Sequence, residues 1–115
     1  MTFKRMTPML QVLDLKQTLA FYTDVLGFEV MGTFPQEGEP FWASVRAGEA
    51  QIMFSYQAPH THDDGETHEP EALFNGSLYF YPEDLDPLHA KVQANAANCS
   101  GYDGRNLTFA TAWTV

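Results

Sequence analysis

The 115-residue chain is poor in cysteine, in basic residues and in long apolar runs. Its single cysteine, Cys99, cannot form an internal disulfide. Fifteen acidic residues against six basic ones give a formal charge of -9, and such a surface repels phosphate backbones, which argues against nucleic acid as a partner. No segment reaches the roughly 20 apolar residues of a membrane span, and the first residues lack the apolar stretch of a signal peptide. We therefore expect a cytoplasmic protein that does not bind membranes.

The composition, with 44% hydrophobic and 14% aromatic residues, is sufficient for a packed core. Asp14 has the chemistry of a helix N-cap, apolar residues recur at helical spacing from Leu15 to Leu26, and Gly27 stands where a helix stop is expected. Strands are predicted at residues 9–13, 28–34, 41–47 and 50–56, the last two joined by a Gly-Glu hairpin. The first half therefore reads as one strand, one helix and three strands.

The second half repeats this pattern incompletely. Residues 58–75 are polar and acidic and read as a linker or long loop. A strand is predicted at 77–81 and a helix follows from about residue 85, but only one clear strand, 107–110, comes after it, behind a predicted turn at 101–104. We divide the single structural domain into a first module (1–57), an acidic inter-module loop (58–75) and a second, shortened module (76–115).

The inter-module loop contains HTHDDGETHE, residues 60–69, with three histidines and four carboxylates. His60 and His62 could bind a metal together if they lay on a strand, and Asp63 or His68 could add a ligand. The spacing matches no zinc module, however, and Asp64-Gly65 favours a turn that divides the cluster.

The segment VLDLKQTLAFYTDVLGFEV, the Gly-Glu hairpin and the closing Asp-Gly-x-x-Leu-Thr-Phe resemble the vicinal oxygen chelate superfamily. This group contains glyoxalase I, bleomycin-resistance proteins and extradiol dioxygenases. The resemblance implies an α+β fold in which paired βαβββ modules form a curved mixed sheet around a cavity, with the helices on its outer face and the second module incomplete. It also implies a homodimer, including the form in which two chains exchange modules.

Catalytic members of that superfamily hold a divalent metal with one His or Glu from each of four strands. The corresponding positions here fall on Thr7, Met53, Ser77 and Thr108. Hydroxyl and thioether groups do not replace imidazole and carboxylate as ligands. The resemblance therefore implies a protein without the family's metal and without a cofactor.

Side chains alternate along a strand, so neighbours two residues from these positions share their face. This alternation adds Gln51 and Ala110 to the cavity-facing positions and extends the predicted ligand-binding lining to Thr7, Met9, Gln11, Trp42, Ser44, Met53, Ser55, Ser77, Tyr79, Tyr81 and Thr108. The opposite parity is wholly apolar and suits a face covered by helices: Leu10, Val12, Ile52, Phe54, Leu78, Phe80, Leu107 and Phe109. An aromatic and polar lining of this kind suits a planar or cationic organic ligand; the alternative is a cavity filled by its own side chains.

Three functions follow from the resemblance. The first is metal-free sequestration of a small organic molecule, such as an antibiotic or toxic compound, as in the bleomycin-resistance branch. The second is a lyase or dioxygenase, with or without a metal, although no residue pair resembles a nucleophile with its base. The third is a degraded member without ligand function. The histidine-rich stretch lies outside the implied cavity, and we expect it to be a mobile acidic flap beside the cavity mouth.

Overall fold

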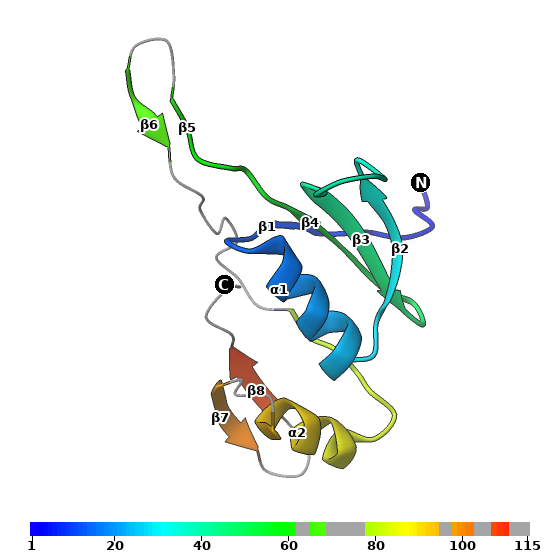
Figure 1. Ribbon diagram of the computed structural model, residues 1–115. Helices are drawn as coiled ribbons and strands as arrows, with labels where there is room; N and C mark the ends of the chain where they lie inside the picture. The colour runs from blue at the N-terminus through cyan, green and yellow to red at the C-terminus, as the bar shows by residue number, and fades with distance from the viewer. Residues whose placement is uncertain (62–64, 69–77, 95–97, 103–106, 111–115) are drawn as a thin grey trace.

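The computed structural model describes residues 1–61, 65–68, 78–94, 98–102 and 107–110 (Figure 1). Its first half contains β1 (Met9–Gln11), α1 (Leu15–Ala20), the π-helical turn η1 (Phe21–Val25), β2 (Glu29–Phe34), β3 (Trp42–Ala47) and β4 (Ala50–Ser55). The four strands form one sheet in the order β1-β4-β3-β2, with β1 parallel to β4 and the other pairs antiparallel. Each strand and the helix predicted for this half is confirmed.

The helical segment begins and ends at the residues that the sequence indicates. The Asp14 carboxylate accepts a hydrogen bond from the Gln17 backbone N–H at 3.0 Å, and the Thr18 hydroxyl donates to the Asp14 carbonyl at 2.7 Å. Its last turn is π-helical, because the Leu26 N–H bonds to the Phe21 carbonyl, five residues back, at 3.2 Å. Gly27 then adopts a φ of 77°, which favours glycine and ends the helix.

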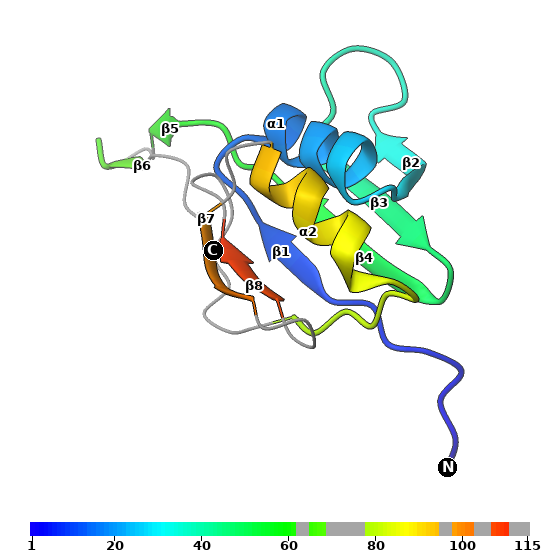
Figure 2. The same ribbon diagram turned by 90° about the horizontal axis from the view of Figure 1, so that it is seen from below.

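The two faces of the sheet differ in burial. Figure 2 shows α1 against one face, and on that face the strand residues are almost completely buried: Leu10 3%, Val12 1%, Ala43 0%, Val45 0%, Ile52 2% and Phe54 0% exposed. Helix side chains complete this core, and the Tyr22 and Phe54 rings lie 4.8 Å apart. The apolar parity predicted for the helix-covered face is thus confirmed for β1 and β4.

The second half contains β5 (His60–Thr61), β6 (Thr67–His68), α2 (Leu85–Ala94), β7 (Asn98–Tyr102) and β8 (Leu107–Ala110). α2 lies beside η1, and its fully buried Val92 joins the core of the first half. β5 pairs with β6 and β7 with β8, each as a separate two-stranded sheet. The structure therefore has the predicted α+β fold, with a curved, open four-stranded sheet and a second module that contains a helix and two strands.

Three details of the second half differ from the predictions. Ser77 lies outside the described residues, and Leu78 to Tyr81 form no strand, although Leu78 and Phe80 still pack against the core. The predicted turn at 101–104 is wrong for Gly101 and Tyr102, which belong to β7. Within the described residues, two strands therefore follow α2 instead of one. The inter-module loop, predicted without regular structure, contains the short β5–β6 hairpin, which projects from the rest of the chain (Figure 1).

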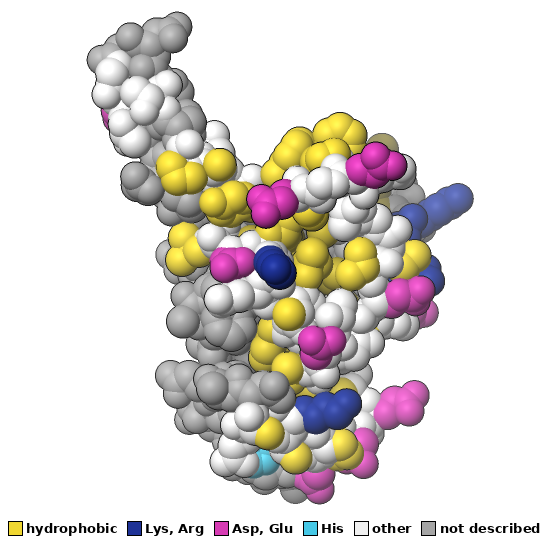
Figure 3. All heavy atoms as spheres, viewed as in Figure 1, with side chains coloured by type: hydrophobic (Ala, Val, Ile, Leu, Met, Phe, Trp, Pro, Cys, Tyr) yellow, Lys and Arg dark blue, Asp and Glu magenta, His cyan; other side chains and the backbone are white. Residues whose placement is uncertain are grey.

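The surface agrees with the acidic composition. On the side viewed in Figure 3, Asp and Glu side chains are spread among the described residues and do not gather in one patch. No helix in the described ranges is long and apolar enough to cross a membrane.

Candidate ligand-binding face

The face of the four-stranded sheet that points away from α1, called the open face below, carries most of the predicted lining of the first module. Strand register sets its side chains in two neighbouring rows across the sheet: Met9, Met53, Ser44 and Gly32, then Gln11, Ser55, Trp42 and Phe34. A further row contains Gln51, Arg46 and Glu29. The strand alternation therefore brings six predicted residues together, namely Met9, Gln11, Trp42, Ser44, Met53 and Ser55.

A β-bulge adds two residues that the sequence analysis did not assign to this face. The register of β2 against β3 shifts between Val30 and Gly32, so that Val30 is opposite Val45 but Gly32 is opposite Ser44. The shift reverses the alternation of β2. Gly32 and Phe34 consequently join the open face, whereas a regular strand would place them against α1.

The open face is apolar and accessible at several points. Met9 is 54% and Phe34 59% exposed, and Phe34 makes an edge contact with Phe41, the ring centroids being 5.5 Å apart. Gly32 has no side chain and is partly exposed, and within 4 Å a Cβ there would meet only the Trp42 ring, at 4.0 Å. The indole therefore lies beside the glycine backbone, an arrangement that suits a flat apolar group.

Polar side chains lie in the same region. The Gln51 amide nitrogen donates to the Ser44 hydroxyl at 3.1 Å, and its amide oxygen accepts from the Arg5 guanidinium at 2.9 Å. Ser44 is 4% exposed, so its hydroxyl is covered by neighbouring side chains. The centre of the open face is thus partly filled by the protein itself, while its Met9 and Phe34 ends remain accessible.

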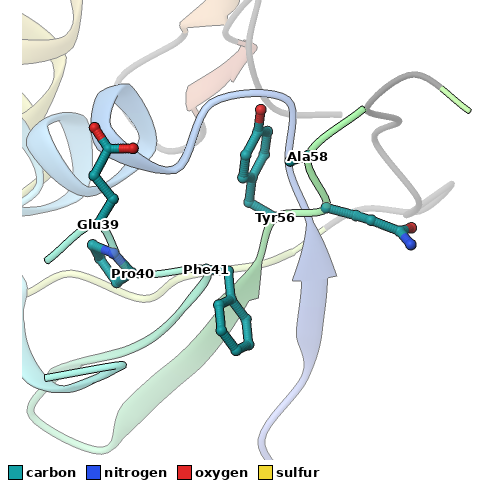
Figure 4. Close-up of a pocket in the computed structure, with 6 residues that line it drawn as sticks. Glu39, Pro40, Phe41, Tyr56 and Ala58 are labelled. Carbon is teal, nitrogen blue, oxygen red and sulfur yellow. The ribbon is translucent and has the colours of Figure 1, made fainter. Parts of the chain in front are cut away.

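A shallow pocket of about 440 Å³ adjoins the aromatic end of the open face. Its lining comes from the loop before β3 and the segment after β4: Glu39, Pro40, Phe41, Tyr56, Gln57 and Ala58 (Figure 4). Glu39 and Tyr56 point to one side of the sheet, and Phe41 points to the other, toward its partner Phe34. The sequence analysis did not predict this pocket, because it depends on how two loops meet.

Among the described residues, the other predicted lining residues lie outside the strand pairs that form these rows. Thr7 is half-buried just before β1, whereas Tyr79 and Tyr81 are 79% and 89% exposed in the segment before α2. Ser77 lies outside the described residues. Thr108 is opposite Gly101 in the β7–β8 sheet, which has no hydrogen-bonded strand in common with the four-stranded sheet.

Residues 5–106 match the family model described as the glyoxalase/bleomycin resistance protein/dioxygenase superfamily. The chain belongs to this superfamily. The resemblance inferred from the FYTDVLGF region is thereby confirmed. No curated protein sequence matches the chain.

Two solved structures with TM-scores above 0.5 show the same fold. A lactoylglutathione lyase from Agrobacterium tumefaciens is 20% identical with a TM-score of 0.57, over 87% of this chain and 76% of that chain. An integron cassette protein from the mobile metagenome of V. cholerae is 20% identical with a TM-score of 0.56, over 95% and 86%. A bleomycin-binding protein from Streptomyces verticillus, solved with copper(II)-bleomycin, is 29% identical with a TM-score of 0.40, but over only 48% of this chain and 41% of that chain.

Two of the four positions that the resemblance assigns to the family's metal ligands, Thr7 and Met53, lie among the described residues. Their hydroxyl and thioether are poor donors for a divalent ion. In the ranges that the structure describes, no three His, Cys, Asp or Glu side chains come together as a possible metal site. The side chains of Ser77 and Thr108 lie outside the description.

Two short segments of the histidine-rich stretch, β5 and β6, pair as a hairpin. Backbone register sets His60 opposite His68 and Thr61 opposite Thr67, whose hydroxyls are 3.1 Å apart. Gly65, with a φ of 86°, lies in the connection between β5 and β6, and the other residue of the predicted Asp64-Gly65 turn lies outside the described residues. His62, Asp63 and Asp64 lie outside the described residues, so the mobile acidic flap stays a prediction.

Proposed function

We propose that this superfamily member binds a planar organic molecule on the open face without a metal, and that it protects by sequestration, for example of an antibiotic or toxic compound. The observation that carries the proposal is the exposure of Met9 and Phe34 on the open face, together with the Trp42 indole that lies beside Gly32. Phe34 and its neighbour Phe41 are exposed at the β2 edge of the face and Met9 at the β1 edge, and exposed apolar groups of this kind make the face a candidate site of interaction. The proposed site lies on the same sheet face as Met53, which the resemblance assigns to a metal-ligand position of catalytic members.

Elementary energetics support a flat ligand. A ring stacked on Trp42 would gain about 0.5–1.5 kcal/mol beyond the burial of its area. Burial itself contributes about 25 cal/mol per Å² of apolar surface. Because Gly32 provides no side chain, a ring can approach the strand backbone there without displacing any group.

The proposal is tested by calorimetric titration of the purified protein with bicyclic aromatic compounds, with and without EDTA. We expect saturable binding whose dissociation constant does not change with the chelator. Trp42→Ala should weaken binding about tenfold, since an aromatic contact and its buried area contribute about 1–2 kcal/mol. Thr33→Val serves as the control, because Thr33 lies on β2 opposite the buried Ala43 and faces the helix side of the sheet, away from the proposed site. Binding that requires an added divalent metal would contradict the proposal.

We also propose that two chains assemble as a homodimer. β1 and β2 are the edge strands of the four-stranded sheet, and unpaired edges readily pair with or are covered by another chain. Large apolar side chains are exposed near them, including Phe3, Met6 and Phe41. Light scattering coupled to size exclusion at micromolar concentration should give twice the chain mass, whereas a monomer would contradict the dimer.

A further inference from the structure

Arg5, Gln51 and Ser44 form a hydrogen-bonded chain that runs from the exposed margin of the open face to its buried centre. Arginine can only donate, so the Gln51 amide oxygen must face Arg5 and the amide nitrogen must face Ser44. The Ser44 hydroxyl therefore accepts from Gln51, and its own proton points elsewhere. The amide has one chemically consistent orientation.

This fixed orientation leaves several donors of the chain without a partner among the described residues. The Gln51 amide oxygen already accepts from Arg5, and the Ser44 hydroxyl oxygen already accepts from Gln51. The second amide N–H of Gln51, the other guanidinium N–H groups of Arg5 and the Ser44 hydroxyl proton have no acceptor in the described part of the chain. Ser44 is 4% exposed, and a buried donor without an acceptor is costly. Acceptor oxygens from a ligand would bond to the free N–H groups of the exposed Arg5 and the half-buried Gln51, while the covered Ser44 holds the Gln51 amide in place.

The charge of the open face differs from that of the whole chain. The four strands contribute Arg46 and Glu29 to this face, and these two are cross-strand partners. Arg5 adds a positive charge through its bond to Gln51. The face thus has one more basic than acidic residue within a protein of net charge -9, so it favours a negative rather than a positive ligand group.

We propose that the Arg5–Gln51–Ser44 chain recognises a carboxylate on the aromatic ligand of the open face. The inference rests on the proposed function and specifies its ligand class as aromatic carboxylic acids. The row of Gln51 and the row of Met53 and Gly32 are two residues apart along the strands, roughly 6.6 Å. A carboxylate attached to a bicyclic ring has a suitable length for contact with both rows.

Three probes of nearly equal shape test this inference: 2-naphthoate, 2-naphthalenemethanol and 2-naphthylmethylammonium. Calorimetry should show 2-naphthoate binding about tenfold more tightly than the alcohol, because hydrogen bonds to a charged group are stronger than neutral ones. The ammonium compound should bind least tightly.

Variants show whether Arg5 is responsible for the preference. Arg5→Gln should reduce the tenfold preference for 2-naphthoate to about twofold or less, while binding of the alcohol changes little. Lys4→Gln removes the same charge one residue away and should retain the preference. Gln51→Glu should also abolish the preference, because the new side-chain carboxylate would pair with Arg5 and repel the carboxylate of the ligand.

The outcomes separate this inference from the proposed function. If the alcohol binds as tightly as 2-naphthoate, or the ammonium compound binds best, carboxylate recognition is wrong and aromatic binding stands. If Lys4→Gln and Arg5→Gln lose the preference for 2-naphthoate equally, the preference is a general effect of positive charge, and the specific role of Arg5 is wrong. If no probe binds, the proposed function and the inference both fail.

Discussion

Replacing Gly32 with valine should separate ligand binding from stability. Gly32 lies on the open face because of the bulge in β2, and a Cβ there would contact only the Trp42 ring, at 4.0 Å. A Cβ at this position is in ordinary contact, and the methyl groups of valine would lie beside the Trp42 ring, over the strand that we propose as the ligand platform. Binding should weaken while folding is unharmed.

The magnitudes follow from the local geometry. Glycine within a strand lacks a side chain to pack and loses more backbone entropy than other residues, so Gly32→Val should raise the free energy of unfolding by about 0.5–1 kcal/mol. A ligand displaced from Trp42 loses an aromatic contact and part of its buried area, about 1–2 kcal/mol, which weakens binding about 5- to 30-fold. Gly32→Ala adds only the Cβ in ordinary contact and should retain most of the binding.

Urea unfolding followed by tryptophan fluorescence measures stability, and calorimetry with 2-naphthoate measures binding. The expected result is a series in which affinity falls from glycine through alanine to valine while stability does not fall. Unchanged 2-naphthoate affinity in a fully folded Gly32→Val protein would refute the assignment of the ligand to the open face. A large loss of stability would instead show that the folded chain has no room for the valine methyl groups beside Trp42.

Two further predictions concern the helix that covers the opposite face of the sheet. Asp14→Ala removes the acceptor of the Gln17 N–H and should lower the free energy of unfolding by about 1 kcal/mol in urea titrations, whereas Lys16→Ala on the same turn should have little effect. Burial raises the pKa of Tyr22 from 10.0 to about 12, so the unfolded chain loses this proton first as the pH rises. Stability relative to Tyr22→Phe should then be constant below about pH 9 and fall by about 1.4 kcal/mol per pH unit between about pH 10 and 12; a pH-independent difference would contradict the burial of the hydroxyl.

The first module could be predicted from the sequence because its signals are local. The N-cap at Asp14, the helical spacing of apolar residues and the stop at Gly27 agree with one another, and β1 and β4 alternate regularly between core and open face. Residues that follow this alternation, such as Met9 and Met53, were correctly placed together. Their role in binding remains a proposal.

What the sequence did not predict depends on contacts between distant segments. Gly32 and Phe34 reach the open face through a register shift that only pairing with β3 reveals. Arg5 precedes the first strand, and its bond to Gln51 joins residues 46 positions apart. Tyr79 alternates correctly with its core neighbours, but a strand also needs a hydrogen-bonded partner, and its segment has none among the described residues.

Methionine methyl groups offer the most direct measurement of the central claim, that an aromatic ligand binds the open face without a metal. Met9 and Met53 are cross-strand partners on this face, whereas Met1 lies at the exposed chain end. With ¹³C-methyl-methionine protein and 2-naphthoate in the presence of EDTA, the methyl signals of Met9 and Met53 should shift upfield through the ring current, and that of Met1 should not. Saturable calorimetric binding that leaves both signals unchanged would contradict the claim.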